Sequence, residues 1–366
     1  MKTILYGALA LGAFGSLATA NTEAKSTWLG LDEELHALSS NLTTQTGGPT
    51  FGAVIKTVYT HSEDEVFGAT PTEDISGFEL YNARLWAEGQ AGDFGWRLSF
   101  DFGEEVENDT PTDGPDLLDA YATWNIAEQF QLTWGQFQFP TLMSNSDTPE
   151  ELLFINRSAL GQALYTWDLG VMVGGDYEQI RWNFALQNGA DEASEEYRLS
   201  GRVEFDLGGG RMQGGSKGAR SQELDATIGV FGFTDDNGAD ADVTAFGADA
   251  RLTMGAFGVG AELVSVDDGE LGLDGAGVVG TPGAFDDATP WSLYASYMLV
   301  PDEWEIGVRY EDLDDDAETT ILTAGVNWHQ PGSPAMWQLN YIIADSDLDA
   351  ADGDAIQLGL VIGLNS

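Results

Sequence analysis

Apolar and polar residues alternate in about sixteen short segments of this chain. Within residues 94–102, large apolar groups occupy every second position, and the residues between them are small or charged. Because successive side chains of a strand point to opposite faces, Arg97, Ser99 and Asp101 share one face and the aromatic residues share the other. Residues 197–207 repeat the pattern. The pattern predicts an all-β fold, a transmembrane antiparallel β-barrel whose apolar face meets lipid and whose polar face lines a wet interior.

The segments are separated by connections of two kinds. The predicted strands are residues 51–60, 77–90, 94–102, 117–126, 130–139, 164–173, 177–187, 197–207, 224–233, 244–254, 257–266, 291–299, 303–312, 319–328, 335–344 and 354–364. Short connections such as residues 91–93 and 127–129 follow even strands, whereas long ones such as residues 103–116 and 267–290 follow odd strands. Residues 208–223 form an exception, because they are long where a short turn is expected. Alternating short and long connections are typical of outer-membrane barrels, with short periplasmic turns and long outer loops.

Charge follows the same division between the two kinds of connection. The long connections are acidic; among their acids are Asp191, Glu192, Glu195, Glu196, Asp235, Asp236, Asp240, Asp242, Asp314, Asp315, Asp316, Glu318, Asp345, Asp347 and Asp349. The exceptional connection instead holds Arg211, Lys217 and Arg220. An even number of strands places the N-terminal and C-terminal ends of the chain on the same side of the membrane. With both ends in the periplasm, the acidic loops face outward and the basic turn faces the periplasm.

The first residues are typical of a secretory signal peptide. Lys2 is followed by an apolar stretch over residues 4–18, which ends in small residues. We therefore expect residues 1–20 to be a signal peptide, residues 21–50 a short periplasmic N-terminal segment, and residues 51–366 the outer-membrane β-barrel. No later stretch approaches the ~18 continuous apolar residues that a membrane-spanning helix needs.

The composition limits the partners and cofactors that the chain can have. The 366 residues carry 61 acidic and 14 basic side chains, a formal charge of −47, and no cysteine. Removal of the predicted signal peptide takes away one lysine and no acid, which leaves a charge of −48. Nucleic acid is excluded as an expected partner, because its binding needs clustered cations to displace counterions from phosphates. Without cysteine, disulfides and thiolate metal sites are impossible.

Five stretches between the second predicted strand and the loop after the fifth resemble a known family, the phosphate-selective porin O and P family of bacterial outer-membrane channels. The stretches are residues 77–85, 97–102, 118–124, 135–140 and 154–158. The resemblance implies a sixteen-stranded trimeric barrel in which the loop after the fifth strand folds inward and narrows the pore. Here that loop is residues 140–161. The resemblance also implies that lysines and arginines line an anion path, whereas the expected mature chain has only three lysines.

Charged residues at inward positions of the predicted strands are the candidate pore lining. They are Arg84, Arg97, Asp101, Asp119, Arg181, Arg198, Arg202, Glu204, Arg251 and Arg309. Inward placement follows from the membrane alone, because an arginine facing lipid costs ~2–4 kcal/mol at the bilayer midplane. Two interpretations stay open. The arginines either coordinate passing anions, or are neutralised by interior acids such as Glu88, Asp101, Glu204, Asp249, Glu305 and Glu311.

The loop over residues 140–161 contributes four charged candidates to the predicted constriction, Asp147, Glu150, Glu151 and Arg157. If the loop folds inward, its acids face the arginines of the wall, and the resulting transverse field sorts solutes by charge and dipole. If the loop lies outside the pore, the same residues are solvated on an ordinary surface.

Neither catalysis nor metal binding is predicted. The three histidines, His36, His61 and His329, lie before the barrel or at strand ends, where none stands beside an outward serine within a strand. Residues 345–349 begin like a calcium loop, but Ala350 occupies the position where such a loop needs glycine. We therefore expect no catalytic residues, no metal and no cofactor.

The sequence predicts a porin, a passive outer-membrane channel for small hydrophilic solutes or ions. Its expected partners are outer-membrane lipid and, by the resemblance, two further copies in a homotrimer. Since interior acids outnumber the arginines, we expect a mixed-charge pore with at most weak selectivity that leans toward cations at low ionic strength. The alternative is a secreted or surface all-β binding protein, lectin-like or adhesive. A soluble sandwich would bury its apolar residues centrally, whereas a porin exposes them in a band.

Overall fold

The computed structural model describes residues 48–62, 75–103, 115–127, 129–189, 197–208, 223–236, 242–267, 270–272, 284–347 and 352–365. The predicted signal peptide, residues 1–20, lies outside the described residues. The same holds for residues 21–47 of the predicted periplasmic segment.

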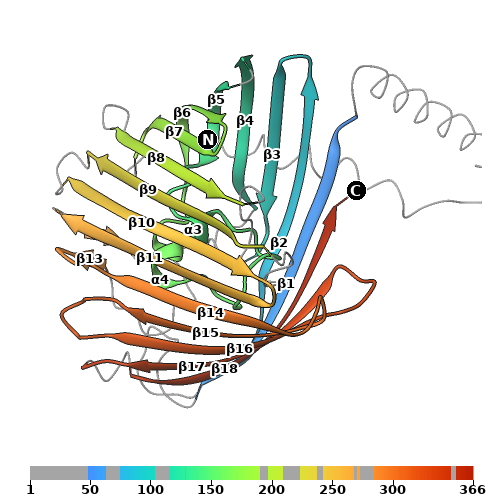
Figure 1. Cartoon of the computed structure of the whole chain (residues 1–366), viewed down its shortest axis with the longest axis vertical. Coiled ribbons are helices and arrows are strands. Elements are labelled where there is room, and N and C mark those ends of the chain that lie inside the picture. Colours follow the sequence, from blue (N-terminus) through green and yellow to red (C-terminus); the bar gives the residue numbers. More distant parts are fainter. Residues whose placement is uncertain are drawn as a thin grey trace, which may run out of the picture. The chain divides into compact units, whose positions relative to one another are not determined.

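Sixteen antiparallel strands close into a barrel in which neighbours follow chain order and β1 pairs with β18 (Figure 1). The barrel strands are β1 Thr50–Ser62, β2 Ile75–Ala91, β3 Phe94–Asp101, β4 Asp116–Ala127, β5 Phe130–Gln138, β6 Trp167–Tyr177, β7 Ile180–Gln187, β8 Arg198–Leu207, β9 Asp225–Asp235, β10 Val243–Met254, β11 Phe257–Asp267, β14 Trp291–Val300, β15 Trp304–Asp312, β16 Thr320–His329, β17 Ala335–Asp345 and β18 Gly353–Asn365. Closure leaves no unpaired sheet edge, which satisfies the backbone polar groups that a bilayer cannot hydrate. The predicted barrel and strand number are confirmed.

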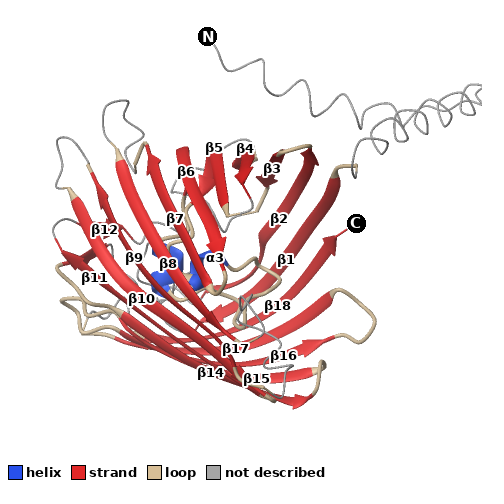
Figure 2. Cartoon of the chain, turned by 45° about the horizontal axis from the view of Figure 1, so that its top comes forward, coloured by secondary structure: helices blue, strands red, loops and turns tan. Residues whose placement is uncertain are grey.

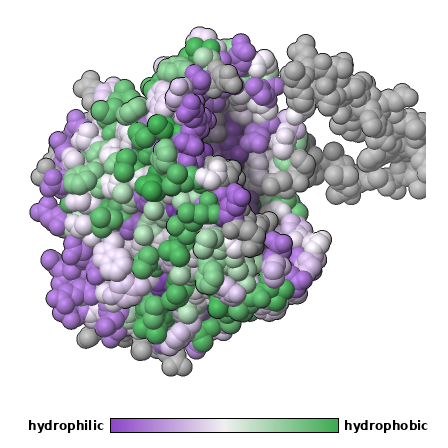
Figure 3. All heavy atoms as spheres, in the orientation of Figure 1, coloured by the Kyte–Doolittle hydropathy of each residue, from purple (hydrophilic) through white to green (hydrophobic). Residues whose placement is uncertain are grey.

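Side chains of the barrel alternate between an apolar outer face and a polar inner face. In β3, Phe94 and Leu98 are exposed on the outside, whereas Ser99 and Asp101 are buried on the inside. Tryptophans exposed on the outer face are Trp96, Trp124, Trp134, Trp304 and Trp337. Figure 3 shows hydrophobic residues spread over the outer surface of the strands. This exposed apolar surface contradicts a soluble sandwich, which would bury the same residues.

Some elements differ from the prediction. Strand β6 begins at Trp167 and not at residue 164, because it follows the short helix α4 (Ala159–Ala163), whose C-cap residue is Leu164. Strand β6 continues to Tyr177, so β7 begins at Ile180 and not at residue 177. The connection after β11, expected to be a loop, contains the small hairpin of β12 (Glu270–Gly272) and β13 (Ala284–Asp286). Three-residue strands are too short for the period of two to be recognised in the sequence.

The tight turns between even and odd strands depend on glycine at two positions. Gly92 between β2 and β3 has a φ of 62°, and Gly255 between β10 and β11 has a φ of 60°. Glycine adopts this left-handed conformation without the steric cost that a Cβ atom imposes. The short turns predicted at these positions are therefore compatible with the observed strand pairing.

The segment between β5 and β6, residues 139–166, contains the helices α3 (Met143–Ser146) and α4. Figure 2 shows both helices within the ring of strands. Leu142 and Leu160 of this β5–β6 segment belong to one buried apolar cluster with Phe231 of β9. Among the described helices, none is long and apolar enough to cross a membrane.

Candidate functional site

Each of the seven predicted inward arginines lies beside a carboxylate. The nitrogen to oxygen distances include 3.1 Å for Arg84 to Asp101, 2.7 Å for Arg97 to Glu88, 3.0 Å for Arg181 to Glu204, 4.0 Å for Arg198 to Asp235, 2.8 Å for Arg202 to Asp249, 2.7 Å for Arg251 to Asp147 and 3.2 Å for Arg309 to Glu311. Arg181 also pairs with Asp206. The arrangement is the one that the neutralisation interpretation requires.

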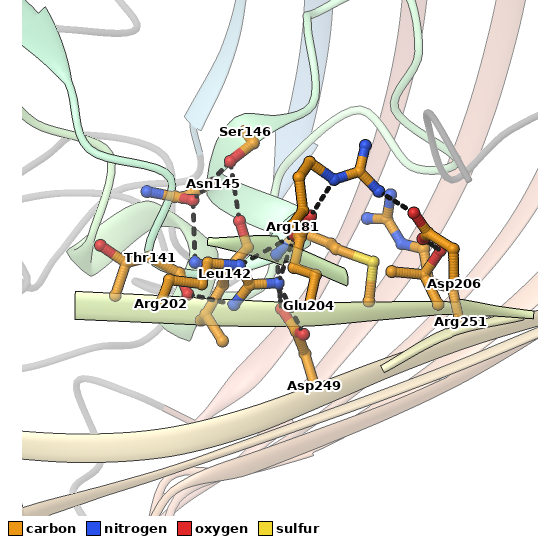
Figure 4. A network of polar contacts seen from close by, with 12 residues as sticks. Thr141, Leu142, Asn145, Ser146, Arg181, Arg202, Glu204, Asp206, Asp249 and Arg251 are labelled. Carbon is orange, nitrogen blue, oxygen red and sulfur yellow. Dashed lines mark hydrogen bonds and ion pairs between the residues drawn. The ribbon is translucent and has the colours of Figure 1, made fainter. Parts of the chain in front are cut away.

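Arg202 of β8 is the centre of a buried polar network (Figure 4). Its guanidinium donates to Glu204 at 2.9 Å and to both oxygens of Asp249 at 2.8 and 3.0 Å. It also donates to the backbone carbonyl of Thr141, at the start of the β5–β6 segment. Asp249 of β10 in turn accepts a hydrogen bond from the backbone N–H of Met143 at 2.6 Å. Arg202 and Asp249 therefore hold the segment as well as each other.

Two further acids attach the segment to the wall. Asp147 and Arg251 of β10 form a bidentate ion pair, with 2.7 Å between Nη1 and Oδ1. Glu262 of β11 accepts hydrogen bonds from the hydroxyls of Ser144, at 2.5 Å, and Ser158. Since Asp147 lies on the segment and Glu262 lies on the wall, carboxylates act from both sides of this contact.

Strand β15 holds the second half of the segment. Glu311 accepts a hydrogen bond from the backbone N–H of Ala159 at 3.0 Å, at the start of α4. Arg309 pairs with Glu311 and donates to the carbonyl of Asn156 at 3.0 Å. A carboxylate at a helix N-terminus satisfies N–H groups that have no partner within the helix.

Three residues that were not predicted from the sequence donate to backbone carbonyls of the segment. Asn327 of β16 donates to Leu153 at 2.7 Å, Gln338 of β17 donates to Leu152 at 3.1 Å, and Lys56 of β1 donates to Ile155. All three side chains are buried. The only signal in the sequence was a polar residue at an inward position. The carbonyl partner cannot be recognised in the sequence, because every residue has a backbone carbonyl.

The predicted loop residues have separate environments. Asp147 contacts a wall arginine directly, whereas Glu151 accepts hydrogen bonds within its own turn, from the backbone and hydroxyl of Thr148. Burial raises the pKa of the Glu150 carboxyl. Arg157 donates to the carbonyl of Ser144 and lies 3.7 Å from the ring centre of Tyr165. The four predicted residues thus do not form a single charged row.

The wall formed by β2, β3 and β4 carries a different charge cluster. Arg97 donates to Glu88 at 2.7 Å and to Asp119 at 3.0 Å. The Asp119 carboxylate also accepts from Ser99 at 2.7 Å and from the indole of Trp167 at 3.1 Å. Asp119 is therefore fixed from three sides, and this cluster consists of two acids and one arginine.

One histidine lies beside an interior acid. Glu305, one of the acids considered as a partner of an arginine, lies 3.4 Å from His329. In the register of β15 and β16, Glu305 is opposite Asn327, close to the end of β16. In the part of the chain that the structure describes, no three His, Asp or Glu side chains are placed to hold a metal ion. The residues that resemble a calcium loop extend outside that part.

A closed antiparallel barrel with an apolar outer face and a charged interior defines the class of protein, a channel of the bacterial outer membrane. Residues 61–232 match the model of the family described as phosphate-selective porin O and P, which confirms the resemblance read from the sequence. No match is found among curated proteins. The family match and the barrel together support a passive outer-membrane channel.

Solved structures share the fold at low sequence identity. An anion-selective porin from Comamonas acidovorans is 13% identical with a TM-score of 0.59, covering 87% of this chain and 99% of that one. The outer-membrane channel DcaP of Acinetobacter baumannii is 12% identical with a TM-score of 0.58, covering 87% and 97%. OmpF of Salmonella typhi, in complex with daunomycin, is 9% identical with a TM-score of 0.58, covering 88% and 99%. At these identities, the comparison concerns the barrel alone.

Proposed function

We propose that this porin is a mixed-charge channel with weak ion selectivity that leans toward cations at low ionic strength. The observation that carries the proposal is the carboxylate beside each of the seven inward arginines. At ~4 Å and an effective dielectric constant near 20, an opposite charge is worth ~4 kcal/mol. A passing anion must compete with that carboxylate, so the arginines provide little net attraction for it.

The β5–β6 segment is the proposed constriction, with residues 140–161 folded inward. Its attachments to β8, β10, β11 and β15 support this role, because inward side chains of these strands make them. The ion pair of Asp147 with Arg251 fixes the position of the segment. The two charges neutralise each other, so they contribute little to the predicted transverse field. The constriction therefore narrows the channel chiefly by its bulk.

The oligomer and the lipid environment complete the proposal. The family resemblance supports a homotrimer embedded in outer-membrane lipid. Native mass spectrometry of the detergent-solubilised protein tests this assembly, and a monomer under conditions that keep the barrel folded contradicts it.

Reversal potentials of the purified channel in asymmetric KCl test the selectivity. We expect a small potential with the sign of potassium preference when both solutions are dilute. A strong preference for chloride, or block of the current by micromolar phosphate, contradicts the proposal and shows that the arginines govern the path. Permeation of neutral sugars in liposome swelling is the control for an open channel.

A further inference from the structure

Two groups of interior charges in the barrel differ in their contact with water. The first group holds the β5–β6 segment, and its side chains are almost completely buried: 1% exposed for Arg202, 2% for Asp249, 5% for Arg251 and 7% for Asp147. We call these the anchor charges. They are paired, desolvated and covered by the segment, so a passing ion has no direct access to them.

The second group is the Glu88, Arg97 and Asp119 cluster on β2, β3 and β4. Its side chains are 44%, 26% and 15% exposed, respectively. Glu88 and Arg97 are opposite each other in the register of β2 and β3, so their side chains share one face. That face is the interior, because Leu98, the next residue of β3, is exposed on the lipid side. We call these the path charges.

The path charges are held in place although water reaches them. The Arg97 guanidinium lies 5.6 Å from the ring centre of Trp86, within the range of a cation–π contact. Hydrogen bonds from Ser99 and from the indole of Trp167 fix the Asp119 carboxylate. A charge that is positioned by its neighbours and still hydrated can act on an ion without reorganising the wall.

We infer that ions pass along the wall of β2, β3 and β4, and that Glu88, Arg97 and Asp119 set the selectivity of the channel. This inference rests on the proposed mixed-charge function and adds the residues responsible for it. Two carboxylates face one guanidinium, so the cluster has a net negative charge, which accounts for the proposed leaning toward cations. The anchor charges contribute to the position of the β5–β6 segment and leave the selectivity almost unchanged.

Cysteine labelling tests the inference on the folded channel, because the natural chain contains no cysteine. Glu88→Cys, Arg97→Cys and Asp119→Cys are each reconstituted in a planar bilayer and treated with a cationic or an anionic methanethiosulfonate reagent. The charge is then introduced after assembly, so any one variant that folds is sufficient. The control is Ser296→Cys on β14, a nearly isosteric change at an inward, buried position.

Under the inference, the cationic reagent raises the chloride to potassium permeability ratio about twofold or more at low salt, and the anionic reagent lowers it. The Ser296→Cys channel reacts slowly, as followed by mass spectrometry, and its reversal potential stays unchanged. Complete labelling at the path positions with no change in permeability ratio overturns the inference. An equal shift in the control also overturns it. The proposed function is tested separately on the untreated natural channel. Strong anion selectivity of that channel would contradict the proposed function.

Discussion

Arg251 of the wall and Asp147 of the β5–β6 segment form a buried ion pair. Both side chains are buried, at 5% and 7% exposure. Removing two charges from water is costly, so such a pair contributes modestly compared with an apolar pair of similar size. The loss of only one partner has a larger effect, because the remaining charge stays buried without compensation.

Arg251→Gln is therefore expected to lower the unfolding free energy by about 3–5 kcal/mol, and Asp147→Asn by a similar amount. The double variant is expected to cost less than the sum of the two, because neither charge remains unpaired. Urea unfolding of the protein in lipid vesicles measures all three variants. Costs that simply add would show that the two side chains act independently.

At the same scale, the sequence predicted the facing of the charged residues better than their partners. The inward position of Arg202 followed from the period of two, since Val203 and Phe205 belong to the apolar face. The contact of Arg202 with the carbonyl of Thr141 could not be predicted, because it joins residues 61 positions apart. The partner is also a backbone carbonyl, which does not depend on the side chain of Thr141.

At the scale of elements, the β5–β6 segment is attached to several strands of the wall. Ser144 and Asp147 contact β11 and β10, whereas Asn156 and Ala159 contact β15. The strand ladders of β5 with β4 and of β6 with β7 do not involve the segment. Part of the segment can therefore be removed without breaking the barrel.

Deletion of residues 144–151 is expected to increase the single-channel conductance and to leave the β-sheet signal in circular dichroism intact. The deletion removes bulk from the proposed constriction, and it removes the contacts of Arg251 with Asp147 and of Glu262 with Ser144. Single-channel recording in a planar bilayer measures the effect. If a folded deletion variant conducts like the natural channel, the constriction lies elsewhere.

Glu150 gives the segment a dependence on pH. Because burial raises the pKa of this carboxyl above its ordinary value of 4.5, the folded state favours the neutral form. The resulting stabilisation is complete below pH 4.5 and is lost as the pH rises through the raised pKa. Glu150→Gln, which stays neutral, should match the natural protein at pH 4 and exceed it in unfolding free energy at pH 8. Urea unfolding at both values checks this, and equal stability of the two proteins at pH 8 rules it out.

The strands were predictable as elements because lipid imposes an apolar residue at every second position, even where the inner residues vary. The start of β6 could not be predicted, because Leu164 and Tyr165 resemble strand residues although they follow α4 and are buried. Their burial arises from packing of the β5–β6 segment within the barrel, a tertiary effect that local alternation does not report.

At the scale of the whole molecule, the formal charge of −47 creates a negative field that short-range pairing does not cancel. This field attracts cations toward the channel and repels anions, over a distance set by the ionic strength. The Debye length is ~10 Å at 0.1 M salt and ~3 Å at 1 M. At high salt, an ion near the axis of the pore therefore responds mainly to charges that it almost touches.

Between 0.1 and 1 M KCl, the part of the cation preference that comes from this field should fade, and the part that comes from the path charges should persist. Reversal potentials at a fixed concentration ratio, measured at both ends of this range, test the prediction. The Glu88→Gln channel is the control, because it removes one exposed acid while nearly all of the total charge remains. A preference that persists at 1 M in the natural channel and disappears in this variant would assign the selectivity to the local cluster. A preference that fades equally in both channels would assign it to the field, because screening acts on the many distant charges before it acts on the single contact.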